Sequence, residues 1–418
     1  MRIGVDLTPL RESAGYRRLY VAGFVSAIGS QATYVTTAYQ LKQLTHSPIA
    51  VGALGLVEIV PLLVFGLYGG VLADRFDRRR LILATELVQL LASAALMVNA
   101  LSPHPRAAVL YVVDAVIIVA GSLQGPSLTA LTQVLVSHDR QRAAAALSNV
   151  RTTVSSIVGP SLGGLAVVAL GTGAVFAATV VAFAGSLVVL LGLRVEGPVR
   201  DPREEVPSIA SGLRYARTRP DVVGTYVIDL LAMALAYPVM MLPFVAQRFP
   251  EHYALSLLYL GLPVGALVAT LSSAWTHRVH HYGRAVVAAA ALWGLGIALF
   301  ATTSSLTLTL AGLVVAGGAD AVSGIFRNTL WNESIPPEVR GRMAGVELIS
   351  YSLGPTFGQF RAGLMAGLSS LRLSLAAGGL GCSGAVGLAA AALPALWRFD
   401  ARHDPHVAEV RRLRGATG

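Results

Sequence analysis

The chain has 418 residues, of which 54% are apolar and only 13% are charged, and its formal net charge is +10. A soluble globular protein carries about 25% charged residues, so this composition excludes most soluble folds. It also excludes an intrinsically disordered chain, which needs low hydrophobicity and high charge. The composition therefore indicates a protein that lies mostly in lipid, and we expect no nucleic-acid partner despite the basic charge.

Apolar residues form blocks long enough to cross a bilayer, which takes about 20 helical residues. Lipid cannot satisfy an open backbone, and the alternating pattern of barrel strands is missing, so helices are predicted. We predict an all-α membrane protein with twelve transmembrane helices in two six-helix, pseudo-symmetric bundles. In chain order the blocks lie near 18–42, 48–73, 80–101, 107–136, 143–168, 172–193, 221–247, 253–275, 285–303, 306–331, 343–368 and 374–397.

Basic residues predict the orientation of these helices. Of the 32 Lys and Arg residues, about 25 fall on one side of a twelve-helix chain and about four on the other. By the positive-inside rule, both termini are predicted to be cytoplasmic. The first fifteen residues are charged and carry no apolar core, so no signal peptide is predicted and the first helix serves as the insertion signal.

The longest polar stretch halves the chain and contains four prolines. It predicts three parts: an N-terminal six-helix bundle over 1–193, a cytoplasmic linker over 194–219, and a C-terminal six-helix bundle with a cytoplasmic tail over 220–418. Within the linker, a short amphipathic helix is predicted near 205–218.

The loop between the second and third blocks reads GGVLADRFDRRR over 69–80. It resembles the G-x-L-A-D-R-x-G-R-[KR] signature of the major facilitator superfamily, with Asp77 in place of the usual glycine. The resemblance implies the major facilitator fold and a cytoplasmic latch between its two halves. The residues that would form this gating motif are Gly70, Asp74, Arg75, Arg78 and Arg79.

A second family-like feature lies in the fifth block, where GPSLGG occupies 159–164. It resembles the core of the antiporter motif found in exporters of this superfamily. Proline bends a helix and glycine lets a neighbouring helix approach closely, so ordinary helix packing is the alternative interpretation. The motif residues are Gly159, Pro160, Gly163 and Gly164.

Within the superfamily, the segments 44–47, 69–82 and 336–342 resemble the bacterial enterobactin-exporter-like branch. The resemblance implies a proton-coupled antiporter in the bacterial inner membrane that exports a small molecule such as a siderophore by alternating access. A multidrug or macrolide efflux pump is the alternative. An uptake symporter, a membrane receptor and an intramembrane enzyme are further alternatives. The chain lacks a phosphate-binding Gly-Lys-[Ser/Thr] loop, so ATP-driven transport is not predicted. It also lacks a nucleophile elbow and an HExxH motif, and no enzyme activity is predicted.

Placing an ionisable side chain in lipid costs free energy, so the ionisable residues inside the blocks are candidates for a functional or structural role. A proton-coupled exporter requires a carboxyl group that is neutral in one state and charged in another. The candidates for this role are, in order, Asp229, Glu58 and Asp114. A structural hydrogen bond between helices is the alternative for each. Arg151 and Arg327 are predicted as partners of these carboxylates.

Three further charged residues lie inside blocks. Asp320 and Arg327 share a helical face, but seven residues separate them by about 10 Å, so no direct bond is predicted. Arg361 is a further buried cation. Glu86 lies within two turns of a cytoplasmic loop, so its carboxylate is predicted to reach the interface or to pair with arginines of that loop.

The superfamily resemblance implies a central cavity lined by the first, fourth, seventh and tenth helices. Side chains predicted to reach a ligand there are Gln31, Tyr34, Gln124, Arg151, Tyr237, Met240, Met241 and Arg327. Cys382 is predicted to be a packed thiol, and the histidines at 277, 280 and 281 a solvated turn. No cofactor and no metal site is predicted. The expected partners are the lipid bilayer, protons and a small-molecule substrate, and the chain is expected to be a monomer.

Overall fold

A computed structural model describes residues 6–193 and 214–416, apart from the side chains of 66–75 and of several residues in 337–349 and 405–416. Every regular element within these ranges is a helix. Contacts between backbones divide the chain into two compact units. The first unit comprises 1–46, 57–205 and 251–259, and the second comprises 47–56, 206–250 and 260–418.

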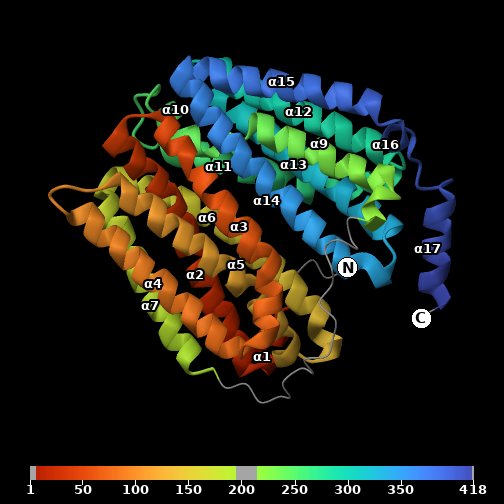
Figure 1. The fold of residues 1–418 in the computed structure, drawn as a ribbon, viewed down its shortest axis with the longest axis horizontal. Helices are drawn as coiled ribbons and strands as arrows, with labels where there is room; N and C mark the ends of the chain where they lie inside the picture. The colour runs from red at the N-terminus through yellow and green to blue at the C-terminus, as the bar shows by residue number, and fades with distance from the viewer. Residues whose placement is uncertain (1–5, 194–213, 417–418) are drawn as a thin grey trace. The chain divides into compact units, whose positions relative to one another are not determined.

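The first unit contains most of the long helices before residue 193, which run side by side in Figure 1. Its longest helix, α2, packs on α5, α6 and α7, and α4 packs on α5 and α7. The core of this unit therefore lies around α2. The elements are α1 (Thr8–Glu12), α2 (Ala14–Thr45), α3 (Pro48–Arg75, of which 48–56 belongs to the second unit), α4 (Arg78–Leu101), α5 (Ala107–Leu135), η1 (His138–Arg140), α6 (Gln141–Leu170) and α7 (Thr172–Leu191).

The second unit is organised around α12, which packs on α13, α15 and α9. Helix α9 also packs on α14, and these five helices lie together in Figure 1. The elements are α9 (Pro220–Ala236), η2 (Val239–Met241), α10 (Leu242–Ala246), α11 (Ala254–Leu271, of which 254–259 belongs to the first unit), η3 (Ser273–Arg278), α12 (Tyr282–Thr302), α13 (Leu306–Ser334), α14 (Pro337–Leu368), α15 (Leu371–Ala392), α16 (Pro394–Arg398) and α17 (Pro405–Ala416).

Each of the twelve apolar blocks coincides with helix in the structure. Within the described residues, ten helical segments are long and apolar enough to cross a membrane, and α2 and α14 are the two block helices outside that set. Both of these helices carry more polar side chains than α3 or α7, among them Gln31 and Gln40 of α2 and Arg361 of α14. Large apolar side chains such as Val181 and Leu388 are exposed, as expected for helices whose solvent is lipid.

Local sequence explains where several helices begin and end. The hydroxyl of Ser13 accepts a hydrogen bond from the Tyr16 amide at the start of α2, and Ser370 caps α15 in the same way. Between α6 and α7 the chain turns at Gly171, whose φ of 84° is a conformation that glycine adopts without strain. This turn separates the fifth and sixth apolar blocks.

The predicted block 221–247 is not one continuous helix. Helix α9 ends at Ala236, Tyr237 is extended with ψ of 114°, and the chain resumes as the short elements η2 and α10. Pro238 disfavours helical geometry at the residue before it and has no N–H to donate, which explains the break. Hydropathy alone hides such an interruption because the whole block is apolar.

Most of the predicted linker, 194–213, lies outside the described residues, and so does most of the amphipathic helix predicted near 205–218. Residues 214–217 are helical. In this turn the Tyr215 hydroxyl donates to the carbonyl oxygen of Ser334 at 3.1 Å and lies 3.4 Å from Nε2 of His406. The end of the linker thus contacts α13 and α17 within the second unit.

Candidate functional site

The gating motif lies at the junction of α3 and α4. The backbone of α3 continues to Arg75, and the side chains of Asp74 and Arg75 and the surroundings of Gly70 lie outside the described part of the chain. Asp77, the departure from the family signature, caps α4 because its Oδ1 accepts from the Arg80 amide at 2.7 Å. The motif's gating role stays a prediction.

Arg79, a neighbouring member of that motif, contacts the end of another helix. Its Nη2 donates to the carbonyl oxygen of Leu191, the last residue of α7, at 3.0 Å. Arg78 is half-buried at the start of α4. A basic group near the last carbonyls of a helix is favourable because those carbonyls carry partial negative charge.

The glycines of the antiporter-like motif place α6 against two neighbours. A Cβ atom at Gly159 would lie 2.5 Å from Cβ of Gln31, and one at Gly163 would lie 3.0 Å from Cα of Ala32, both on α2. Gly164 faces the first turns of α11, and there the Ser256 hydroxyl donates to the carbonyl oxygen of Ser161 at 2.8 Å. Small residues therefore set close helix contacts on two faces of α6, next to Pro160.

The first unit brings two proton-coupling candidates together. Glu58 of α3 and Asp114 of α5 are hydrogen bonded to each other through their carboxyl groups. Only about 5% of Glu58 and 6% of Asp114 is exposed. The second oxygens, Oε1 of Glu58 and Oδ2 of Asp114, have no hydrogen-bond partner among the described residues. An ionised carboxylate only accepts hydrogen bonds, so this pair holds at least one proton.

Glu86 of α4 is the centre of a second polar cluster, and its predicted position was wrong. It is 1% exposed and accepts from Gln124 of α5 at 2.7 Å and from the Ser26 hydroxyl of α2. Gln89 donates to Gln124 at 2.9 Å, which extends the cluster by one turn of α4. The side chain turns into the helix bundle instead of toward the loop because several hydrogen-bond donors are available there.

In the second unit, Asp229 of α9 forms an ion pair with Arg327 of α13, the partner predicted for the buried carboxylates. Both side chains are 4% exposed. The Ser350 hydroxyl of α14 donates to Oδ2 of Asp229 at 3.0 Å, and the Arg327 guanidinium lies 5.5 Å from the centre of the Tyr351 ring. Three helices therefore meet at this ion pair.

The prediction that Asp320 and Arg327 do not bond was wrong. Nη2 of Arg327 lies 3.6 Å from Oδ1 of Asp320, one further acidic contact for the same guanidinium. The distance along the helix axis did not predict this contact, because helical side chains point toward the helix N-terminus. The long side chain of Arg327 therefore extends along α13 toward Asp320. Arg327 thus contacts two carboxylates.

The remaining cavity candidates are distributed over both units. Gln31 and Tyr34 are half-buried on α2. Tyr237 lies at the break after α9 and stacks on Trp293 with ring centres 6.5 Å apart, while Met240 and Met241 are buried in η2. Their contact with a ligand stays a prediction. Arg361 is not free in a cavity, since its Nη1 donates to the carbonyl oxygen of Ser374 at 3.1 Å and joins α14 to α15.

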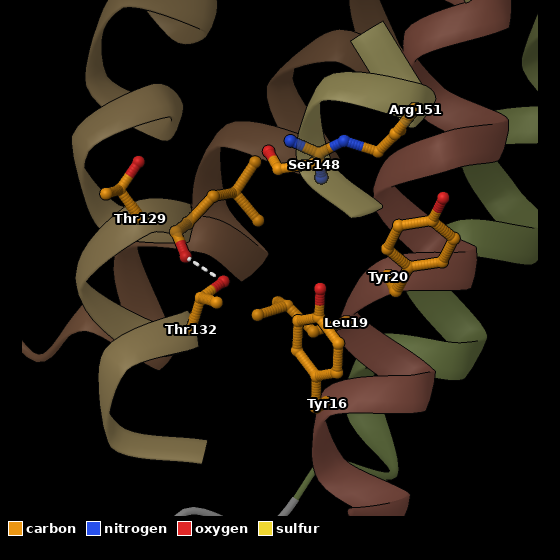
Figure 2. Close-up of a pocket in the computed structure, with 8 residues that line it drawn as sticks. Tyr16, Leu19, Tyr20, Thr129, Thr132, Ser148 and Arg151 are labelled. Carbon is orange, nitrogen blue, oxygen red and sulfur yellow. Dashed lines mark hydrogen bonds between the residues drawn. The ribbon is translucent and has the colours of Figure 1, made fainter. Parts of the chain in front are cut away.

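Arg151 of α6 was predicted to pair with a buried carboxylate, and within the described residues no such ion pair forms. It lines a recess in the first unit together with two tyrosines of α2 and hydroxyl residues of α5 and α6 (Figure 2). Sequence reasoning singled out Arg151 and missed the tyrosines. Their spacing of four residues at the start of a basic-flanked helix was the available signal.

Comparisons with known proteins agree with this architecture. A model of the transmembrane secretion effector family matches residues 5–409. The enterobactin exporter EntS of Shigella boydii serotype 18 and that of Escherichia coli O1:K1 are each 28% identical over 378 residues, which is 89% of both chains.

Solved structures share the fold of this chain. The nucleoside transporter NupG aligns with a TM-score of 0.73 and 12% identity over 93% of this chain and 100% of its own. A POT family transporter in complex with 5-aminolevulinic acid aligns with a TM-score of 0.70 and 12% identity over 92% of this chain and 97% of its own. At these identities the likeness concerns the fold alone.

Proposed function

We propose that this chain, which belongs to the transmembrane secretion effector family of the major facilitator superfamily, is a proton-coupled antiporter. Its exported substrate would be a siderophore-like small molecule. The chain is a multi-pass membrane transporter and not an enzyme. Export would proceed by alternating access, in which two helical bundles expose a central site first to the cytoplasm and then to the outside.

The observation that carries the proposal is the hydrogen-bonded pair of Glu58 and Asp114. A carboxyl pair that holds one proton in a site withdrawn from water is equipped to accept and release a proton as its surroundings change. The second oxygens have no hydrogen-bond partner among the described residues, so they are free to accept a hydrogen bond from a group that arrives during transport. Buried carboxylates with no structural ion pair are otherwise costly in a membrane helix.

Asp229, placed first from sequence, is the second candidate for the proton. Its ion pair with Arg327 stabilises the ionised form of the Asp229 carboxyl group. Proton binding at Asp229 would therefore require that pair to open during the transport cycle. The two candidates differ in this respect, and substitutions separate them.

The direction of transport and the substrate class are supported by different observations. The close packing of α6 through Gly159 and Gly163 matches the antiporter-like motif of exporters. The relatives are named enterobactin exporters, which favours a siderophore over a macrolide or another drug. By the same likeness we place the chain in the bacterial inner membrane. The distribution of basic residues supports cytoplasmic termini, and we propose that the chain is a monomer.

Inside-out membrane vesicles test this proposal. With an acidic interior, wild-type vesicles should accumulate enterobactin, and a protonophore should abolish accumulation. Accumulation of erythromycin in place of enterobactin would support the macrolide alternative. No accumulation of any tested solute, or accumulation that ignores the proton gradient, would contradict proton-coupled export.

Matched variants identify the proton site. Glu58→Gln and Asp114→Asn should each abolish gradient-driven accumulation, while Glu409→Gln on exposed α17 should leave it unchanged. Loss of accumulation in Asp229→Asn supports Asp229 as the proton site only where the variant protein remains folded in the membrane. Normal accumulation in Asp229→Asn removes it from the candidates, and normal accumulation in Glu58→Gln removes Glu58.

A further inference from the structure

Asp320 of α13 differs from Asp229 in its access to water. Its side chain is 43% exposed, whereas those of Arg327 and Asp229 beside it are each 4% exposed. Tyr351, whose ring centre lies 5.5 Å from the Arg327 guanidinium, is 42% exposed, and Asn328 is exposed as well. Polar side chains of membrane helices face the bundle interior or a water-filled cavity. Asp320 therefore lies where water reaches a carboxyl group next to a buried ion pair.

The two carboxylates hold the single guanidinium of Arg327 unequally. Asp229 forms the ion pair with Nη1 and accepts a hydrogen bond from the Ser350 hydroxyl at 3.0 Å. Asp320 makes one contact, 3.6 Å from its Oδ1 to Nη2, which is longer than a hydrogen bond. Among the described residues, Asp320 has no hydrogen-bond partner. Arg327 therefore stabilises the ionised form of Asp229 more than that of Asp320.

The cluster of Asp229, Arg327 and Asp320 carries one excess negative charge when all three groups are ionised. A guanidinium stays protonated in proteins, so the excess charge is removed by a proton on one of the carboxylates. A proton on Asp229 would break the buried ion pair, which is costly. A proton on Asp320 makes the cluster neutral and leaves that pair closed.

The neighbouring helices bring no described cation to Asp320 other than Arg327. Helix α14 contributes Glu347 and Tyr351, an acid and a phenol that interact electrostatically with each other. Like charges nearby favour the protonated form of a carboxyl group.

Other ionisable groups on the helices packed against α13 make contacts near its end. Tyr226 of α9 stacks on Trp331, Tyr282 of α12 donates to Glu333 at 3.4 Å, and His406 of α17 lies 3.0 Å from the carbonyl oxygen of Ser334. Residues 331–334 lie at least about 16 Å along α13 from Asp320. These groups are therefore too distant to balance its charge directly.

We infer that Asp320 is a proton-binding residue of the second unit, in addition to the carboxyl pair of the first unit. The inference rests on the proposed export function, in which protons drive transport. The proton comes from water and binds to a carboxylate oxygen of Asp320, and no other covalent bond changes. Unlike proton binding at Asp229, this step does not require the ion pair with Arg327 to open.

Infrared difference spectroscopy of the purified full-length protein in lipid tests the inference without any transport. A protonated carboxyl group has a C=O stretching band that a carboxylate lacks. The wild type should gain this band when the pH falls from about 8 to about 5, a range above the pKa of ordinary exposed carboxyl groups. Asp320→Asn should reduce the gain by the share of one carboxyl group.

Matched variants identify the residue that holds the proton. The carboxyl band of glutamic acid lies at a lower frequency than that of aspartic acid. Asp320→Glu should therefore shift the band, and Asp229→Glu should leave it in place. Glu347→Gln, on the neighbouring helix α14, is the control and should keep the full gain.

Three outcomes would overturn the inference. These are an undiminished gain in Asp320→Asn, a band that shifts in Asp229→Glu, and a gain that is lost in Glu347→Gln. If Asp320→Asn does not fold, Asp320→Glu decides. Absence of vesicle transport together with the expected infrared changes contradicts the export function alone. Proton-coupled accumulation together with an undiminished gain in Asp320→Asn contradicts the inference alone.

Discussion

The two units treat buried charge in opposite ways. In the second unit, Asp229 and Arg327 neutralise each other and Asp320 adds a second acidic contact. In the first unit, Glu58 and Asp114 lie side by side with like chemistry, and Arg151 lies apart from any described carboxylate. Opposite charges in contact favour one fixed arrangement, whereas the carboxyl pair of the first unit needs a proton from outside the chain.

This contrast indicates that the buried charged groups have different roles in the two units. The second unit contains an electrostatic link between α9, α13 and α14. The first unit contains groups whose charge state depends on what is bound. We therefore expect substitutions of the second-unit charges to reduce stability most, and substitutions of the first-unit charges to reduce coupling or binding at nearly constant stability.

The largest effect is expected for Arg327→Gln or Asp229→Asn. Removing one member of a buried ion pair leaves an uncompensated charge and typically costs about 3–5 kcal/mol of unfolding free energy. The double variant should lose less than the sum of the single variants. Denaturant titration of the purified protein in detergent measures both quantities, and additive losses would show that the two residues do not act as a pair.

A packing difference gives the next effect. A Cβ atom at Gly317 of α13 would overlap the carbonyl oxygen of Leu262 on α11, whereas Gly121 of α5 has nothing within 4 Å of that position. Gly317→Ala should therefore destabilise the second unit by about 1–3 kcal/mol. Gly121→Ala is the matched control in the first unit. Equal unfolding free energies for the two variants would refute the close approach of α11 and α13.

Gly23→Ala tests the position of the Arg151 guanidinium beside Gly23. The new methyl group would meet Nη1 of Arg151 and displace the flexible end of that side chain. Because the far end of an arginine side chain can move aside, we expect the unfolding free energy to fall by less than about 1 kcal/mol. Denaturant titration measures this loss, and a loss as large as that of Gly317→Ala would show that the Arg151 guanidinium cannot move aside.

The smallest effect on stability is expected at the carboxyl pair. The amide of Glu58→Gln donates the hydrogen bond that a protonated carboxyl group donates, so the unfolding free energy should change by less than about 0.5 kcal/mol. The same variant should abolish proton-coupled transport. A loss as large as that of Arg327→Gln would remove the contrast between the units.

Much of the fold could be predicted because lipid permits few solutions. Long apolar blocks must be helical, and their number and order follow from hydropathy. The break in the helix at Tyr237 could not be predicted from hydropathy, because hydropathy carries no information on backbone geometry. Pro238 and Pro243 were the available signals in the sequence. The linker helix and the gating side chains of Asp74 and Arg75 lie outside the described residues, so those predictions stay open.

The residues of the candidate site could be identified from the sequence, but several of their contacts could not. Asp229 and Arg327 were identified, and so were Glu58 and Asp114, because charge inside an apolar block is conspicuous. The pairing of Glu58 with Asp114 depends on how α3 and α5 are rotated against each other, which the sequence of either helix does not specify. Glu86 was misplaced because distance to the loop was considered and the donors of α2 and α5 were not.

Proton movement coupled to substrate entry is the most direct test of the central claim. Proteoliposomes with an acidic interior and an enclosed pH-sensitive dye receive enterobactin from outside. The wild type should release protons as enterobactin enters, and the Glu58→Gln, Asp114→Asn double variant should release none. Entry of enterobactin into wild-type proteoliposomes without a dye response, or proton release undiminished in the double variant, would contradict the account.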